Sequence, residues 1–325
     1  MADIEKDQLV LVTVLTLSYN SPDLYAAIDS VLKQDYKRIQ YVLVDDGTEE
    51  FSEKSVCTYI EEFRTSNIED YIIVSNPENY GTVRSTNIGL LRAEGEYIFN
   101  LAGDDVFTDS SVISKWVSAF QQSGALVMTA YRNVYDVSMK YYLGRMPTVN
   151  QVNKIRTLVP AELFEEVARG NFIFGCCTAF SRRCLEQYGY YDERYKLIED
   201  HSKILRLLRQ GVAIAFFDQS VIQYRGNGSS SGECYNKVYE HDVDLIYQYE
   251  IMPYTKNKKC IQKAHRKWKT RQQSARDLSV KLQRLGTCSF CAFFLKLGFY
   301  GRYPIESIRG LLANPAKLKK MFHRI

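Results

Sequence analysis

The sequence has no disulfide framework, no internal repeat and no low-complexity segment. Its eight cysteines show none of the spacings of a disulfide-linked domain, and MADIEKDQLV at the start does not resemble a signal peptide, so we expect reduced thiols in the cytoplasm. Cys288-x-x-Cys291 has no second CxxC, and small apolar filler is the favoured interpretation over a zinc or redox site. A composition of 46% hydrophobic and 25% charged residues excludes a disordered chain.

Acidic residues are scarce near the C-terminal end. Residues 256–325 hold 18 Lys and Arg but only two acids, a net charge of +16, whereas the preceding 255 residues carry 24 bases and 36 acids, a net charge of −12. Cys260–Leu285 has the composition of a basic helix. The stretch CSFCAFFLKLGFY after it is too short and too charged to span a bilayer.

This basic region predicts a surface that binds a partner. A basic amphipathic segment with Trp268 and a cluster of Phe suits the anionic inner face of a membrane. The alternatives are packing of these helices against another copy of the chain or another partner, and a plain solvated face. Nucleic-acid binding is not expected, because the bases form one tail without a known binding module. We therefore expect a cytoplasmic protein that lies peripherally on the inner face of a membrane through residues 256–325.

Strands and helices alternate along the first hundred residues. Four stretches have the composition of buried strands, and helical apolar spacing follows each of the first three. Asp23 is expected to cap the first of these helices. This order predicts an α/β fold with a mostly parallel sheet covered by helices. The predicted strands are Leu9–Tyr19, Ile39–Gly47, Tyr71–Ser75 and Tyr97–Leu101.

The predicted strands end in polar residues. The first ends at Tyr19-Asn20, the second at Asp45-Asp46, and the fourth at Asp104-Asp105. Ligands of such sheets bind beyond the carboxyl ends of the strands, so we expect these residues to meet at one rim. Repulsion and desolvation disfavour adjacent carboxylates unless a cation or solvent is present. Carboxylates at a strand end suit Mg²⁺ or Mn²⁺, which would let an acidic site bind phosphate esters.

Each of these features alone also fits an ordinary structural role. Paired aspartates commonly close turns, Tyr19 fits packing, and Glu199-Asp200 at a helix start interacts favourably with the helix dipole. The order and spacing of the features along the chain favour a functional interpretation.

Three ordered blocks resemble glycosyltransferase family 2, the inverting transferases with a GT-A fold. The resemblance covers about residues 9–231. It implies a GT-A-type, mostly parallel Rossmann-like sheet flanked by helices, in a domain of residues 1–232 with a nucleotide-binding half (about 1–125) and an acceptor half (about 126–232). Residues 233–325, beyond the resemblance, are expected to form a C-terminal helical, basic region that associates with a membrane. The blocks are TVLTLSYNSPDLYAAIDSVLKQDYKRIQYVLVDDGTEE, NYGTVRSTNIGLLRAEGEYIFNLAGDD and TAFSRRCLEQYGYYDERYKLIEDHSKILRLLRQG.

The resemblance implies roles for residues at the rim. Tyr19 would stack on the nucleobase, Asp46 would bond it, and Asp45 would help to hold the nucleotide. Asp104 matches the last Asp of the family's Asp-x-Asp and would bind Mn²⁺ or Mg²⁺ on the donor diphosphate, with Asp105 next to it. The residues expected to bind the nucleotide-sugar are Tyr19, Asn20, Asp45, Asp46, Arg84, Asn87, Asp104 and Arg225.

The resemblance also implies a reaction. Asp200 would be the general base that deprotonates an acceptor hydroxyl, and Glu199 would orient it. We expect transfer of a sugar from a nucleotide-diphosphate sugar, with UDP-sugars foremost, to a saccharide or lipid-linked acceptor in cell-surface polysaccharide, O-antigen or capsule biosynthesis. A nucleotidyltransferase is the alternative enzyme, but SYNSPDLY lacks the Gly and Lys of its phosphate-binding loop. A non-catalytic sugar-nucleotide-binding subunit is the other alternative.

The chain departs from the family pattern at three positions. Ala102 replaces the first Asp of Asp-x-Asp, so metal binding would rest on Asp104. Thr86 stands where the family often has Arg, and Arg84 is expected either to contact phosphate by another route or to be a surface charge. Asn227 replaces a His that often follows the Arg of YRGNGSSS, a loop expected either to close over the diphosphate or to be a plain turn.

Overall fold

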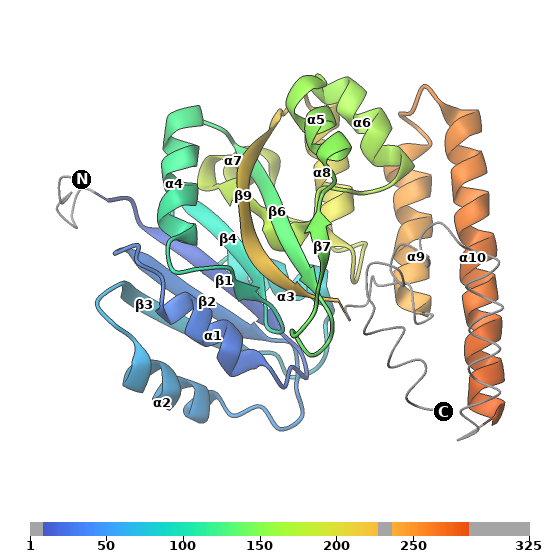
Figure 1. The fold of residues 1–325 in the computed structure, drawn as a ribbon. Coiled ribbons are helices and arrows are strands. Elements are labelled where there is room, and N and C mark those ends of the chain that lie inside the picture. The colour runs from blue at the N-terminus through green and yellow to red at the C-terminus, as the bar shows by residue number, and fades with distance from the viewer. Residues whose placement is uncertain (1–8, 227–235, 286–325) are drawn as a thin grey trace.

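The computed structural model describes residues 9–226 and 236–285. A nine-stranded sheet runs through it in the order β3-β2-β1-β4-β8-β6-β9-β5, with β7 paired to β6 (Figure 1). The strands are β1 Val12–Ser18, β2 Ile39–Asp45, β3 Ile68–Ser75, β4 Tyr97–Ala102, β5 Val106–Phe107, β6 Val127–Tyr135, β7 Tyr142–Met146, β8 Thr178–Ser181 and β9 Ile214–Arg225.

Helices connect these strands and cover both faces of the sheet (Figure 1). Two short elements, the 3-10 helix η2 (Gly175–Cys177) and the π-helical turn η3 (Tyr247–Ile251), lie among them. The α-helices are α1 Leu24–Leu32, α2 Glu53–Phe63, α3 Thr82–Leu90, α4 Val112–Ser123, α5 Val149–Thr157, α6 Pro160–Arg169, α7 Arg182–Tyr188, α8 Glu199–Arg209, α9 Lys237–Ile246 and α10 Lys258–Leu285.

The first four long strands form the parallel half of the sheet. β1 pairs parallel with both β2 and β4, and β2 pairs parallel with β3. Crossover helices α1, α2 and α3 join β1 to β2, β2 to β3 and β3 to β4, as the alternation in the sequence predicts. β8 runs antiparallel to β4 and β6, while β6 and β9 are parallel. The predicted α/β fold with a mostly parallel sheet is therefore confirmed.

Apolar side chains fill a core on each face of the sheet. Successive residues of a strand point to opposite faces, so Tyr41 and Leu43 pack in the core that α1, α2 and α4 cover, whereas Val42 and Val44 pack in the other. The central strands are buried on both faces and are therefore almost continuously apolar in sequence.

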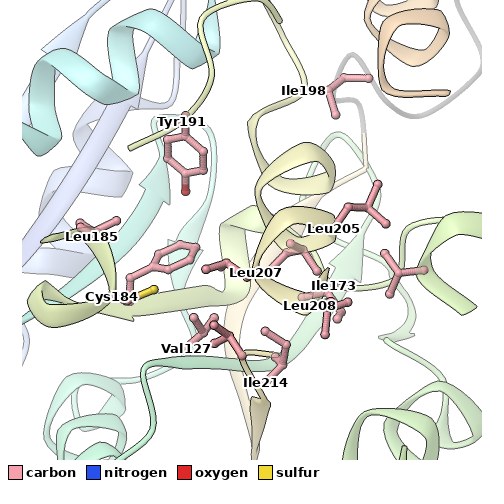
Figure 2. Packing of buried hydrophobic residues seen from close by; sticks show 14 of the residues in the cluster. Val127, Ile173, Cys184, Leu185, Tyr191, Ile198, Leu205, Leu207, Leu208 and Ile214 are labelled. Carbon is pink, nitrogen blue, oxygen red and sulfur yellow. The ribbon is translucent and has the colours of Figure 1, made fainter. Parts of the chain in front are cut away.

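The second core fixes α8. Leu205, Leu207 and Leu208 on this helix are buried among residues that include Val127 and Ile173 (Figure 2). Burying a leucine side chain contributes about 1.5–3 kcal/mol, so these three hold the helix firmly. The N-terminal end of α8, which begins at Glu199, is thereby placed against the sheet.

Ion pairs and ring contacts attach the C-terminal helices. Glu250 in η3 pairs with Arg206 and Arg209 of α8 at 2.7 and 2.9 Å. α10 packs beside α9, with the His265 ring 3.9 Å from that of Tyr247 (Figure 1). Within residues 9–226 and 236–285, none of the helices combines the length and the apolar character needed to cross a bilayer. The expected CSFCAFFLKLGFY segment lies outside the described residues.

Candidate active site

A cleft of about 760 Å³ opens at the carboxyl ends of β1 and β4. It gathers side chains from segments far apart in the sequence, because the parallel strands end at the same edge of the sheet. Four of the residues predicted from the sequence do not line it: Asp45, Arg84, Asn87 and Asp105. Seven do: Tyr19, Asn20, Asp46, Asp104, Glu199, Asp200 and Arg225.

Asp45 supports the turn that presents Tyr19. Its carboxylate accepts hydrogen bonds from the backbone N–H of Thr48 at 2.8 Å and from the Thr48 hydroxyl at 2.6 Å. The Thr48 hydroxyl oxygen in turn accepts the backbone N–H of Asn20 at 2.9 Å. Tyr19 is 50% exposed, so its ring is open to a ligand. Asp45 therefore acts through Thr48 rather than on the contents of the cleft.

Asp46 holds the loop before α3 against β2. Its carboxylate accepts four hydrogen bonds: from the backbone N–H groups of Tyr80 and Gly81, from the Ser85 hydroxyl and from the Asn76 amide. The side chain is buried, although it borders the cleft. These bonds occupy both carboxylate oxygens, and its contact with a nucleobase stays a prediction.

Arg84 and Asn87 on α3 make structural contacts. The Arg84 guanidinium lies 3.9 Å from the centre of the Tyr80 ring. The Asn87 amide donates to the Tyr191 carbonyl and to Glu193, and accepts the Tyr191 backbone N–H, each at 3.0 Å. Neither side chain lines the cleft, so the structure does not bring them to the predicted phosphate site.

The two carboxylates after β4 are placed differently. Asp104 lines the cleft, and burial raises the pKa of its carboxyl group, an effect that Arg225 opposes. Asp105 is buried beneath; its Oδ1 accepts the backbone N–H of Arg225 at 2.8 Å, and its Oδ2 has no hydrogen-bond partner. Burial also raises the pKa of Asp105 well above its ordinary value. Of the two predicted metal ligands, only Asp104 faces the cleft.

Arg225 fastens this rim instead of reaching freely into the cleft. Its Nε donates to the backbone carbonyl of Asp104 at 3.1 Å, and a terminal nitrogen pairs with Asp23 at 3.0 Å. Asp23 precedes α1, as predicted, but its side chain makes no capping hydrogen bond and is used for this ion pair. Ser229–Ser231 of the predicted closing loop lie outside the described residues.

Glu199 and Asp200 begin α8, and both line the cleft. Asp200 Oδ2 accepts the backbone N–H of Gly175 at 3.0 Å. Glu199 packs so closely on Gly175 that a Cβ added there would lie 2.5 Å from its Oε1. Burial first, and then the charge of Asp200, raises the pKa of Glu199 well above its ordinary value. Glu199 is thus favoured in its protonated form beside Asp200.

The loop before these carboxylates is held from α9. Asp242, which is 1% exposed, accepts the backbone N–H groups of Lys196, Leu197 and Ile198 at 2.9, 2.6 and 3.1 Å. Tyr239 of the same helix lines the cleft. Residues beyond 232 therefore contribute to the site, and the division of the chain at 232 stays a prediction.

Sequence reasoning missed several residues of the cleft. Arg132 on β6 lines it with a guanidinium between two aromatic rings, and Asp242 supports its wall. The sequence around each of them is that of an ordinary strand or helix. Their partners are more than 40 residues away in sequence, so no local pattern indicates these contacts. Only the amphipathic spacing of α9, with an acid on its buried side, offered a signal for Asp242.

A divalent ion fits the acidic rim. Among the described residues, no three His, Cys, Asp or Glu gather closely enough to hold an ion by themselves. Mg²⁺ and Mn²⁺ are commonly held by one or two carboxylates together with substrate phosphates. Asp104 faces the cleft, and Asp105, whose Oδ2 has no hydrogen-bond partner, follows it in the chain, so a bound cation would favour the ionised form of both carboxyl groups. These residues fit an ion that phosphate oxygens help to hold.

The fold is that of the GT-A glycosyltransferases. Staphylococcus aureus TarS 1-349, solved with UDP-GlcNAc, superimposes with a TM-score of 0.57 at 16% identity, over 78% of this chain and 70% of that one. The mannosyltransferase PcManGT of Pyrobaculum calidifontis, solved with GDP-Man and Mn²⁺, superimposes with a TM-score of 0.54 at 15% identity, over 98% of this chain and 89% of that one.

Residues 13–189 match the family model described as glycosyl transferase family 2, and the chain belongs to that family. An uncharacterized glycosyltransferase of Haemophilus influenzae is 23% identical over 253 residues, covering 75% of this chain and 74% of the relative. EpsJ of Bacillus subtilis, also an uncharacterized glycosyltransferase, is 25% identical over 75% of this chain and 70% of its own. The matches span 33% of a Rickettsia felis relative and 62% of a Rickettsia typhi relative.

Proposed function

We propose that the chain is an inverting glycosyltransferase that moves a sugar from a nucleoside-diphosphate sugar to a hydroxyl group of a saccharide acceptor. The observation that carries this proposal is that Asp104 and Asp200, 96 positions apart in sequence, line one cleft together with the exposed ring of Tyr19. One side of the cleft suits a diphosphate and the other suits an attacking hydroxyl. A single displacement needs these two functions on opposite sides of the transferred sugar.

On the donor side, Tyr19 offers a face for the nucleobase, and Asp104 would hold the divalent ion at the diphosphate. When bound, Mn²⁺ or Mg²⁺ neutralises charge that develops on the leaving diphosphate. Asp45, Asp46 and Arg225 keep this side in shape through the contacts described above. The ligands of the two solved relatives, UDP-GlcNAc and GDP-Man with Mn²⁺, support a nucleotide-sugar donor, with UDP-sugars the first to test.

On the acceptor side, Asp200 is the proposed base. It takes the proton of the acceptor hydroxyl as that oxygen attacks the anomeric carbon, the bond to the diphosphate breaks, and the anomeric configuration inverts. The Gly175 N–H orients its carboxylate. Glu199 would donate a hydrogen bond to Asp200 or to the acceptor, because burial favours its protonated form.

The test begins with the donor. A panel of nucleotide-sugars with Mn²⁺ is screened for thermal stabilisation, since a ligand that binds the native state raises its melting temperature. We expect at least one member to stabilise the wild type, and the Asp200→Asn variant to bind it while failing to release the nucleoside diphosphate. Stabilisation by nucleoside triphosphates alone would favour the nucleotidyltransferase alternative. Donor binding without any transfer by the wild type would favour the non-catalytic subunit.

We further propose that residues 256–325 place the enzyme on an anionic membrane surface, next to a lipid-linked acceptor of cell-surface polysaccharide synthesis. Five exposed bases lie in the first half of α10: Lys258, Lys259, Lys263, Arg266 and Lys267. Changing all five to Gln should release the protein from vesicles of phosphatidylglycerol. The matched control is Lys37→Gln with Lys54→Gln, two exposed bases on the opposite half of the chain. Equal sedimentation of both variants would refute the membrane role and favour packing against another copy.

A further inference from the structure

Arg132 is a cation of the cleft to which the mechanism above gives no part. It lies on β6 at the position paired with Ile222 of β9, and its guanidinium borders the cleft. The ring of Phe174 lies 3.7 Å from the guanidinium carbon on one side, and the ring of Tyr224 lies 4.0 Å away on the other. Two rings fix the plane of the guanidinium, so its N–H edge has a set direction.

The hydrogen-bonding capacity of this guanidinium is poorly used. Its Nη1 contacts the Cys176 sulfur at 3.5 Å, and sulfur is a weak acceptor. Its Nε is buried without a hydrogen-bond partner. Within residues 9–226 and 236–285, no carboxylate lies within ion-pair distance of it, although Asp105 lies close enough for their charges to interact. Arg132 is half-buried, and a charge partly removed from water is stabilised by a partner.

Arg225, the other arginine that borders the cleft, differs in this respect. Its guanidinium is bound to the Asp104 carbonyl, the Val137 carbonyl and the Asp23 carboxylate. Among the described residues lining the cleft, Arg132 is therefore the arginine that still has donors for a ligand. Its location is close to the proposed base, because Cys176, which it contacts, directly follows Gly175, whose N–H donates to Asp200. The side chains of Arg132, Asp104 and Asp200 line the same cleft.

We propose that Arg132 binds an oxyanion of the sugar-nucleotide, either the terminal phosphate of the diphosphate or a carboxylate on the transferred sugar. This inference rests on the proposed function, because it needs a donor in the cleft. Two parallel N–H groups of a planar guanidinium match the oxygens of either group. Lysine would keep the charge but lose both the fork and the stacking between Phe174 and Tyr224.

The test compares nucleotides by titration calorimetry with Mn²⁺ on the full chain. The probes are UDP, GDP and the matching monophosphates, followed by UDP-glucose and UDP-glucuronate. The variants are Arg132→Gln and Arg132→Lys. The matched control is Arg145→Gln, which removes an exposed arginine that also stacks on a ring, that of Tyr131 at 3.9 Å, but does not line the cleft.

If the phosphate is the ligand, Arg132→Gln weakens binding of the nucleoside diphosphate about 10- to 100-fold and leaves binding of the monophosphate unchanged. The diphosphate affinity of Arg132→Lys then lies between those of the wild type and Arg132→Gln. If the sugar carboxylate is the ligand, diphosphate binding is unchanged and the preference of the wild type for UDP-glucuronate over UDP-glucose disappears in Arg132→Gln. An equal loss for diphosphate and monophosphate would indicate a distorted pocket and overturn the proposal, as would wild-type affinity for every probe. If the wild type binds no nucleoside diphosphate, the proposed function itself fails.

Discussion

Replacing Asp242 should slow sugar transfer, although in the proposed mechanism this residue contacts neither the donor nor the acceptor. Its carboxylate accepts three backbone N–H groups of the loop that leads into Glu199 and Asp200. A hydrogen bond to a charged acceptor contributes about 1.5–3 kcal/mol, and such values do not add. Water can replace Asp242 at the exposed Lys196, whereas the N–H of buried Ile198 would stay unpaired. We therefore expect Asp242→Ala to cost about 2–4 kcal/mol, which lowers the melting temperature of a chain of this length by roughly 3–6 °C.

The effect on activity follows from the position of the loop. A shift of about 1 Å in the base costs on the order of 100-fold in rate, so release of nucleoside diphosphate from the donor should fall by that factor. Donor affinity should fall less than the rate, because Asp242 bonds the loop before the base directly, whereas that loop reaches the donor side through Lys196, whose carbonyl accepts the Val83 N–H at 3.1 Å. Asp244→Asn on the same helix is the control, since Asp244 pairs with His265 and Lys269 of α10. An Asp242→Ala enzyme with wild-type melting and turnover would refute this role.

Three further predictions concern the two sides of the cleft. Asp104→Asn should abolish the gain in donor affinity that Mn²⁺ gives in calorimetry; an undiminished gain would contradict the assignment. Gly175→Ala should lower the free energy of unfolding by about 1–3 kcal/mol and suppress transfer, because its methyl group would meet Glu199 Oε1; a stable, active variant would show that the contact relaxes freely. Burial of protonated Glu199 contributes to the free energy of unfolding, because the pKa of this side chain is raised in the folded state. That contribution is fully present below pH 4.5, the ordinary pKa, and is lost as the pH rises through the raised pKa of the folded state. The melting temperature of Glu199→Gln minus that of the wild type should therefore be larger at pH 8 than at pH 5. An equal difference at both pH values would exclude ionisation of Glu199 in this range.

Local patterns in the sequence were sufficient for the parallel half of the fold. Continuous apolar runs predicted β1, β2 and β4, because strands buried on both faces cannot alternate. The convergence of Asp104 and Asp200 on one cleft was also predicted, from strand ends and from the order of the blocks.

Individual side-chain roles were harder to predict, because they depend on partners distant in sequence. Asp45 and Asp46 are neighbours, yet one closes a turn through Thr48 and the other gathers the loop before α3. Asp104 and Asp105 are the same residue type at adjacent positions, but Asp104 lines the cleft, whereas the Asp105 carboxylate accepts the backbone N–H of Arg225. The position of Arg132 in the cleft depends on β7 and β9, which pair with β6 on either side of it at Met146 and Ile222. No spacing rule along the chain contains this information.

In the proposed mechanism, Asp104 and Asp200 act on the same donor from opposite sides of one cleft. The most direct measurement determines, for Asp104→Asn and Asp200→Asn side by side, the affinity for the donor with Mn²⁺ and the rate of nucleoside diphosphate release. We predict that Asp104→Asn loses metal-dependent affinity, and that Asp200→Asn keeps that affinity while its rate falls at least about 1,000-fold. An Asp200→Asn variant that turns over at the wild-type rate would contradict the account.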